Sequence, residues 1–200
     1  MKRLLLVRHG ESEWNAVRRL QGQADIRLSS KGETQAAGLA STIAQLAPDQ
    51  VITSDLCRAK RTAELLGFPN AVCDARLREI DVGDWTGKSI ADIIAADPDG
   101  YRGWRAGTFA PPGGEVWQTF TDRTALAVRS SMKTADRLLV VCHGGVIRAL
   151  LQTLLQLEPR RIIPVGPASL TILAMKPNEQ DMRLEVFNFA PGGPVVNAPD

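Results

Sequence analysis

Short apolar runs alternate along the chain with longer segments in which apolar residues recur every three or four positions. The runs have the length of strands and the longer segments have the period of amphipathic helices. The pattern therefore predicts an α/β fold with a mostly parallel central sheet of about six strands. The predicted strands are Arg3–Val7, Gln50–Thr53, Ala71–Cys73, Arg137–Cys142, Ala168–Met175 and Arg183–Phe187. The predicted helices are Lys31–Leu46, Arg58–Leu66, Ser89–Ala96, Val116–Met132 and Val146–Leu155.

The clearest helical pattern lies in residues 31–46, where Ala36, Leu39 and Ile43 follow one another at steps of three and four. This spacing places the three side chains on one stripe that faces the core. Ser29 and Ser30 precede the segment and supply hydroxyl groups that can cap the N-terminus of the helix.

The segment from residue 97 to residue 115 interrupts the alternation, because glycine and proline recur along it. Such a stretch predicts a loop or a mobile excursion from the fold. It also carries Trp104 and Phe109, for which two interpretations stay open. The two rings either form a lid that covers a bound substrate and excludes water, or they pack within a peripheral pair of helices.

Length and composition predict one globular domain. The chain has 200 residues, of which 44% are apolar and 23% are charged, enough apolar material for a substantial core. No second core follows the interruption, so we assign residues 1–190 to a single domain. Residues 191–200 are rich in proline and glycine, and we expect them to form a flexible C-terminal tail.

Charge and cysteine content narrow the functional class. Lys and Arg number 24 against 22 Asp and Glu, and this formal net charge of +2 gives no reason to expect a nucleic-acid partner. No apolar run reaches the roughly 18 residues that span a bilayer, and none near the N-terminus resembles a signal peptide. Three irregularly spaced cysteines and two histidines indicate neither a disulfide framework nor a zinc site. We expect a soluble cytoplasmic protein with no membrane partner, no cofactor and no obligatory metal, although a carboxylate-only Mg²⁺ site stays open.

The two histidines of the chain stand in equivalent positions. Residues 4–10 and 138–144 each contain a run of apolar residues, then one further residue, then His-Gly. Ligands of open parallel sheets bind beyond the carboxyl ends of the strands, and adjacent strands end at the same edge. We therefore expect His9 and His143 to share a site, with the glycines that follow them allowing a sharp turn and the approach of a ligand.

Charged residues near the same strand ends suggest a phosphate ligand. Arg8 precedes His9, and Arg58 follows the second predicted strand near the start of a helix. A planar, permanently charged guanidinium suits phosphate recognition, and a helix N-terminus favours an anion. A carboxylic acid beside a phosphate ester can protonate the leaving oxygen. The residues alone do not choose among Glu79, Asp81 and Asp84 for that role.

Six motifs in order resemble the histidine phosphatase superfamily, the phosphoglycerate-mutase-like proteins. They extend from residue 3 to about residue 150. The residues that carry the resemblance are Arg8-His9-Gly10-Glu11-Ser12-Glu13-Trp14-Asn15, Gly22-Gln23-Ala24-Asp25, Ser54-Asp55-Leu56-Cys57-Arg58-Ala59, Leu77-Arg78-Glu79, Pro112-Gly113-Gly114-Glu115 and His143-Gly144-Gly145-Val146-Ile147-Arg148.

The resemblance implies a three-layer α/β/α fold and a metal-independent phosphoryl transfer in two steps. His9 would attack phosphorus and form a phosphohistidine, and Glu79 would act as general acid and then general base. Arg8, Arg58 and His143 would complete the catalytic set by holding the non-bridging oxygens. The implied contacts to substrate are Asn15, Gln21, Gly22 and Gly144.

The implied partner is a small-molecule phosphate ester. Among the phosphatases of the family, the motifs are most similar to those of glucosyl-3-phosphoglycerate phosphatases, so a phosphorylated sugar-glycerate is the expected substrate. Alternatives are a phosphoglycerate mutase, a broad-specificity or α-ribazole phosphatase, and a non-catalytic module that binds phospholigands. We also consider a homodimer, because the strand predicted at Arg183–Phe187 could form a sheet edge.

Overall fold

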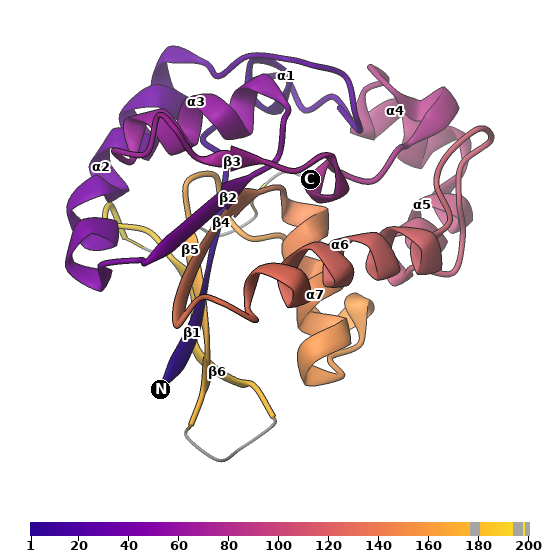
Figure 1. Ribbon diagram of the computed structural model, residues 1–200. Coiled ribbons are helices and arrows are strands. Elements are labelled where there is room, and N and C mark those ends of the chain that lie inside the picture. Colours follow the sequence, from indigo (N-terminus) through magenta and orange to yellow (C-terminus); the bar gives the residue numbers. More distant parts are fainter. Residues whose placement is uncertain (177–180, 194–197, 199–200) are drawn as a thin grey trace.

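The computed structural model describes residues 1–176, 181–193 and 198. Within these residues, six strands form one mixed sheet in the order β3-β2-β4-β1-β5-β6 (Figure 1). β3, β2, β4 and β1 are parallel, β5 runs antiparallel to β1, and β6 runs antiparallel to β5. All six predicted strands and the mostly parallel sheet are confirmed. The strands are β1 (Lys2–Arg8), β2 (Gln50–Thr53), β3 (Val72–Cys73), β4 (Arg137–Cys142), β5 (Leu170–Met175) and β6 (Arg183–Phe189).

The five predicted helices are present with ends within two residues of the prediction. Ser29 caps the longest of them, because its side chain accepts a hydrogen bond from the Gly32 amide at 3.1 Å. Short 3-10 turns η1 (Ala75–Leu77), η2 (Gly83–Trp85) and η3 (Pro159–Arg161) lie between the longer elements. The α-helices are α1 (Glu13–Ala16), α2 (Ser30–Leu46), α3 (Cys57–Leu65), α4 (Ile90–Ala96), α5 (Pro98–Ala106), α6 (Trp117–Ser131) and α7 (Gly144–Leu155).

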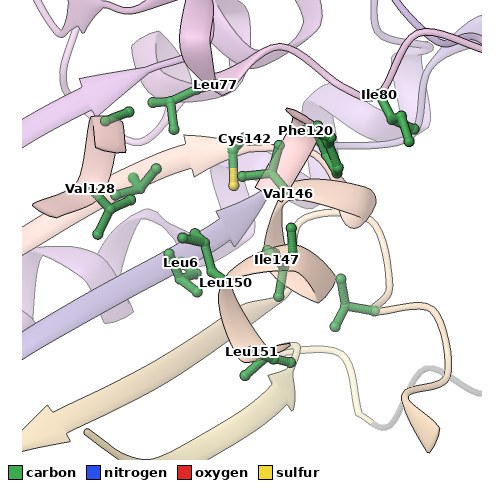
Figure 2. Packing of buried hydrophobic residues seen from close by; sticks show 14 of the residues in the cluster. Leu6, Leu77, Ile80, Phe120, Val128, Cys142, Val146, Ile147, Leu150 and Leu151 are labelled. Carbon is green, nitrogen blue, oxygen red and sulfur yellow. The ribbon is translucent and has the colours of Figure 1, made fainter. Parts of the chain in front are cut away.

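Helices cover both faces of the sheet and give it the three-layer α/β/α arrangement. Successive side chains of β1 point to opposite faces, so Leu5 packs under α2 and α3 while Leu6 packs under α6 and α7. Figure 2 shows the second of these layers, where Leu6 faces Leu150 of α7 and Val128 of α6 lies nearby. The core therefore has two halves, one on each side of the sheet.

The pairing of β1 with β4 brings the two histidines to one edge. The strands are adjacent and parallel, and Arg8 lies opposite Cys142 in the register. The next residues, His9 and His143, therefore leave the sheet at the same level. The prediction that the two His-Gly pairs meet at the carboxyl edge of neighbouring strands is confirmed.

The prediction of a loop is wrong for residues 98–106, which form α5. Asp97 begins this helix by accepting a hydrogen bond from the Gly100 amide at 2.8 Å, and Pro98 occupies its first turn. Gly107 ends it with a φ of 76°, a left-handed conformation that glycine adopts without strain. Glycine and proline therefore mark the two ends of a helix here, and α4 and α5 form a pair beside the sheet (Figure 1).

The last strand and the predicted C-terminal tail are described to different extents. β6 lies at one end of the sheet order within the described residues, as the predicted edge strand requires. The homodimer stays a prediction. Most of the predicted C-terminal tail, residues 194–197 and 199–200, lies outside the described residues.

Among the described residues, none of the helices combines the length and apolar character that crossing a bilayer requires.

Candidate active site

A cavity of about 650 Å³, including its open mouth, lies where β1 and β4 end. Its lining includes seven of the nine predicted site residues. They are Arg8, His9, Gln21, Gly22, Arg58, Glu79 and Gly144. His143 lies directly behind His9, with 5.1 Å between the ring centroids and an angle of 64° between the ring planes. Asn15 does not line the cavity.

The backbone fixes which nitrogen of His9 faces the cavity. His9 is 3% exposed, and its Nδ1 lies 2.7 Å from the carbonyl oxygen of Gly10. Since a carbonyl only accepts hydrogen bonds, Nδ1 carries the proton and Nε2 keeps its lone pair. Burial, followed by the charges of Arg58 and Arg8, holds the pKa of His9 well below its ordinary value of 6.5. His9 is therefore a neutral imidazole with a nucleophilic nitrogen.

His143 is also neutral for the same physical reasons. It is fully buried, and burial lowers its pKa well below 6.5, with further contributions from Arg58, His9 and Arg8. Its Nε2 lies 2.9 Å from the hydroxyl oxygen of Ser54, which follows β2. Its Nδ1 has no hydrogen-bond partner among the described residues. Ser54 is not among the predicted site residues, and it fixes the orientation of the second imidazole.

The Arg58 side chain lies in the interior instead of on a solvated helix face. It is 1% exposed and donates to the carbonyl oxygens of Ala24 at 2.7 Å and Gly22 at 2.8 Å. Burial lowers its pKa to about 10, so the guanidinium still carries its charge at neutral pH. Arg8 is 2% exposed and donates to the carbonyl oxygen of Val165 at 2.5 Å. Both guanidiniums are held by backbone carbonyls beside His9.

Glu79 enters the cavity from the chain between η1 and η2. One carboxylate oxygen accepts from the Ile80 amide at 2.8 Å, and the other accepts from the Gly145 amide at 3.0 Å. The second of these amides belongs to the first turn of α7, so Glu79 is tied to the helix that follows His143. Asp81 instead accepts from the Gly83 amide at 2.9 Å and is not in the lining. The structure thus places Glu79 in the cavity.

The four residues predicted to contact the substrate differ in burial, backbone conformation and hydrogen bonding. Gln21 is 7% exposed, and its Oε1 has no hydrogen-bond partner among the described residues. Gly22 has a φ of 50°, and Gly144 begins α7 beside Arg8. Asn15 completes a capping box with Ser12 at the start of α1, and its Oδ1 accepts from the Ser12 amide at 3.1 Å. Asn15 thus caps α1 through Oδ1, and its predicted contact to substrate stays a prediction.

Arg123 of α6 holds the Glu79 segment, although it is not a predicted site residue. Its guanidinium donates to the carbonyl oxygens of Arg76, Arg78 and Glu79 at 2.7, 2.8 and 3.0 Å. It also makes a two-bond ion pair with Glu115 at 2.7 Å for both bonds. No local spacing signals this role, because the contact joins residues 44 positions apart.

The rest of the cavity lining is mainly apolar but contains two more arginines, Arg105 of α5 and Arg148 of α7. Neither is a predicted site residue. Trp104 is 5% exposed and packs edge-on against Trp85, with ring centroids 6.1 Å apart, so it forms part of the cavity wall. Phe109 is 38% exposed and also contacts Trp85. Both rings thus pack beside a helix pair, and the lid stays a prediction. The apolar residues of the lining include Leu20, Ile80, Val82, Ile147, Ile162, Ile163, Pro164 and Val165.

The arrangement resembles a site for phosphoryl transfer because a neutral nucleophile, two cations and a carboxylic acid converge on one cavity. In the described part of the chain, no group of three or more His, Cys, Asp or Glu side chains is placed to hold a metal ion. A family model of the histidine phosphatase superfamily (branch 1) matches residues 4–188. The chain belongs to the histidine phosphatase superfamily.

Individual members of the superfamily are similar to this histidine phosphatase over most of their length. A probable phosphoglycerate mutase of Salmonella paratyphi C, GpmB, is 38% identical over an alignment of 167 positions, which covers 78% of this chain and 76% of that protein. A mycobacterial glucosyl-3-phosphoglycerate phosphatase, solved as a complex with VO3, is 35% identical with a TM-score of 0.84. That superposition covers 94% of this chain and 99% of the other. Mycobacterial hydrolase 1 is 33% identical with a TM-score of 0.86, over 94% of this chain and 99% of its own. These matches confirm the phosphoglycerate-mutase-like fold.

Proposed function

We propose that this histidine phosphatase hydrolyses a phosphate monoester without a metal, through a phosphohistidine on His9, with a phosphorylated sugar-glycerate such as glucosyl-3-phosphoglycerate as substrate. The observation that carries the proposal is the His9–Gly10 hydrogen bond of 2.7 Å. It leaves Nε2 unprotonated in a cavity that also contains Arg8, Arg58 and Glu79. A nucleophile must present a lone pair to phosphorus, and here the fold itself sets the tautomer.

In the first step, Nε2 of His9 attacks phosphorus and the bond between phosphorus and the ester oxygen breaks. The carboxyl proton of Glu79 goes to that oxygen, so the alcohol leaves neutral. Arg8 and Arg58 stabilise the charge on the non-bridging oxygens, and His143 donates a hydrogen bond from its buried ring. Asn15, Gln21, Gly22 and Gly144 complete the contacts to the substrate, and Asn15 also caps α1.

In the second step, water attacks phosphorus on the other side and the bond to His9 breaks. The Glu79 carboxylate takes the proton that water loses, and His9 returns to its neutral state. Each group thus ends the cycle as it began. The two amides that bond to Glu79 keep its carboxyl group at the cavity wall throughout.

The substrate class rests on the likeness to a glucosyl-3-phosphoglycerate phosphatase. The cavity lining also includes apolar residues that no catalytic step uses, among them Ile163 and Pro164. A sugar attached to the glycerate would contact these residues. Trp104 adds an aromatic side chain to the same lining.

A phosphoglycerate mutase is the second candidate, because GpmB is named as a probable mutase and is 38% identical to this chain. A mutase returns the phosphoryl group to another hydroxyl, whereas a hydrolase gives it to water. The two functions use the same first step. They differ only in which acceptor reaches the phosphohistidine.

A phosphate-release assay in EDTA tests the proposal. The panel contains glucosyl-3-phosphoglycerate, mannosyl-3-phosphoglycerate, 3-phosphoglycerate, α-ribazole phosphate and p-nitrophenyl phosphate. We expect the glycosylated glycerate to give the highest kcat/KM, and we expect His9→Ala to abolish release. Arg102→Gln, on the exposed side of α5, is the matched control that keeps full activity. Conversion of 3-phosphoglycerate to its 2-isomer faster than phosphate release would instead support the mutase, and EDTA-sensitive release would contradict the metal-independent step.

A further inference from the structure

We propose that Asn188 of β6 is a positioning residue for Arg8, acting through the chain segment that precedes β5 (residues 165–169). This inference rests on the proposed function, which assigns the Arg8 guanidinium to the non-bridging oxygens of the phosphoryl group. Asn188 is not among the described residues that line the cavity. It lies on the strand at one end of the sheet order, and β5 separates that strand from β1, which ends at Arg8.

The segment before β5 holds the end of β1 by hydrogen bonds to both the side chain and the backbone. The Val165 carbonyl accepts from Nη1 of Arg8 at 2.5 Å, and the Ser169 carbonyl accepts from the Arg8 amide at 3.1 Å. The His9 carbonyl accepts from the Ala168 amide at 3.0 Å. The place of the guanidinium and of the backbone that carries the nucleophile therefore depends on where this segment lies.

The backbone of the segment is strained and buried. Ala168 has a φ of 49°, in the left-handed region that disfavours a residue with a Cβ atom. Such a conformation persists only where the surrounding contacts hold it. Residues 166–169 are buried, so an amide there that lost its acceptor could not turn to water instead. The contacts that anchor the segment therefore decide where the Val165 carbonyl points.

The Asn188 side chain supplies such an anchor at a single peptide group. Its Oδ1 accepts from the Gly166 amide at 2.6 Å. That amide and the Val165 carbonyl belong to the same peptide bond, which is planar and trans, so the two groups point in opposite directions. Asn188 therefore fixes one side of a rigid plane whose other side accepts from Arg8. Polarisation of the peptide group by the first hydrogen bond also strengthens the second.

A β-bulge explains why a side chain of this strand reaches the segment. The register of β5 and β6 shifts between Leu170 and Ile172, so that two residues of β6 oppose the single Thr171. Asn188 is one of the two, and its φ of 55° lies in the left-handed region that asparagine adopts more readily than most residues. Its amide donates to the Thr171 hydroxyl at 3.3 Å. Bulges of this kind re-aim a side chain, and here the side chain is turned to the Gly166 amide.

The test measures how tightly the site holds an oxyanion. The inhibition constant (Ki) of orthovanadate, taken with p-nitrophenyl phosphate as substrate and without EDTA, does not depend on how much of the protein is folded. Asn188→Gly keeps the left-handed backbone of the bulge but removes Oδ1. We expect this variant to raise Ki and to lower kcat/KM, each on the order of tenfold, because the Arg8 guanidinium loses its alignment.

Two comparisons separate positioning from a merely structural role. Asn188→Asp keeps an acceptor oxygen at the same place, so both values should return toward those of the wild type. Arg8→Met removes the guanidinium, and in that background Asn188→Gly should lower kcat/KM no further. Glu185→Gln is the matched control, because Glu185 lies on the same strand but pairs with Arg3 at the surface. It should change neither value.

The possible results separate this inference from the proposed function. A wild-type Ki and kcat/KM in folded Asn188→Gly, or an equal loss with and without the Arg8 guanidinium, would overturn the role of Asn188 while hydrolysis itself stands. If Asn188→Gly does not fold, Asn188→Ser takes its place under the same criteria, because its shorter side chain does not reach the Gly166 amide. If the wild-type protein neither hydrolyses p-nitrophenyl phosphate nor binds orthovanadate, the proposed function fails and the positioning role fails with it.

Discussion

The guanidinium of Arg123 donates to the carbonyl oxygen of Glu79 at 3.0 Å, and the same group is paired with Glu115 through two bonds of 2.7 Å. The backbone of Glu79 is thus fixed from α6, while its carboxylate is fixed from α7 by the Gly145 amide. Two helices on one face of the sheet therefore set the position of the proposed general acid. Catalysis by proton transfer depends on this position within fractions of an ångström.

Replacing Arg123 should therefore damage catalysis more than binding. Arg123→Lys keeps the charge but cannot reach three carbonyls and Glu115 together, so we expect kcat to fall on the order of 10–100-fold, with a smaller change in KM. The free energy of unfolding should fall by about 1–3 kcal/mol. Steady-state kinetics and urea denaturation measure the two effects. Arg129→Lys, on the exposed side of the same helix, is the control and should change neither.

Gly145 has no room for a side chain. A Cβ atom at this position would overlap Oε1 of Glu79 and lie 2.9 Å from its carboxyl carbon. Gly145→Ala should therefore displace the carboxylate and lower kcat by at least tenfold. Gly38→Ala is the matched control, because Gly38 lies in α2 and a methyl group added there would meet nothing within 4 Å. That substitution should raise stability by about 0.5–1 kcal/mol and leave kcat unchanged. Equal kinetics for the two alanine variants would contradict the described contact.

The two buried histidines predict a loss of stability in mild acid. Their pKa values in the folded protein lie well below 6.5, so the unfolded chain binds protons below pH 6.5 while the folded chain does not. The free energy of unfolding should fall as pH drops below 6.5, with each histidine contributing up to about 1.4 kcal/mol per pH unit. Denaturant titrations between pH 7 and 5 measure this slope, above the range where carboxylates titrate. His143→Asn should halve it, and an unchanged slope in that variant would argue against a neutral His143.

The pH–rate profile should also lose activity on its acid side only at a pH well below 6.5. His9 attacks only when Nε2 is unprotonated, and its pKa lies well below 6.5. Once kcat/KM is divided by the fraction of the ester present as the dianion (second pKa about 6), it should therefore stay constant as the pH falls through 6.5. Arg58 is the larger of the two electrostatic causes of this shift. Arg58→Gln should therefore move the limb toward 6.5, in addition to lowering the rate. A wild-type limb at pH 6.5 that persists after this correction for the substrate would contradict a buried, neutral His9.

Much of the fold and site could be predicted because the signals are local or repeated. The two His-Gly pairs each end an apolar run, and strand pairing then brings them to one edge without further information. Ser29 caps α2 as its hydroxyl suggests. The helix α5 was not predicted, because frequent glycine and proline usually indicate a loop. Here Asp97, Pro98 and Gly107 are instead the start and stop signals of a helix.

Other features depend on contacts that only the folded chain creates. Arg123 meets Glu79 across 44 positions, and Ser54 meets His143 across 89. Neither partner lies in a spacing that sequence periodicity would reveal. Asn15 adds a local contact of this kind, because its Oδ1 caps α1 together with Ser12 while its role toward the substrate stays a prediction.

The phosphohistidine is the central claim, and rapid quenching tests it most directly. Glu79→Gln cannot activate water, while p-nitrophenol leaves without needing a proton, so this variant should give a burst of about one p-nitrophenol per active site. Mass spectrometry of the quenched protein should then place one acid-labile phosphoryl group on His9, and His9→Ala should show neither burst nor label. A full rate of turnover with no phosphoryl group on His9 would contradict the account.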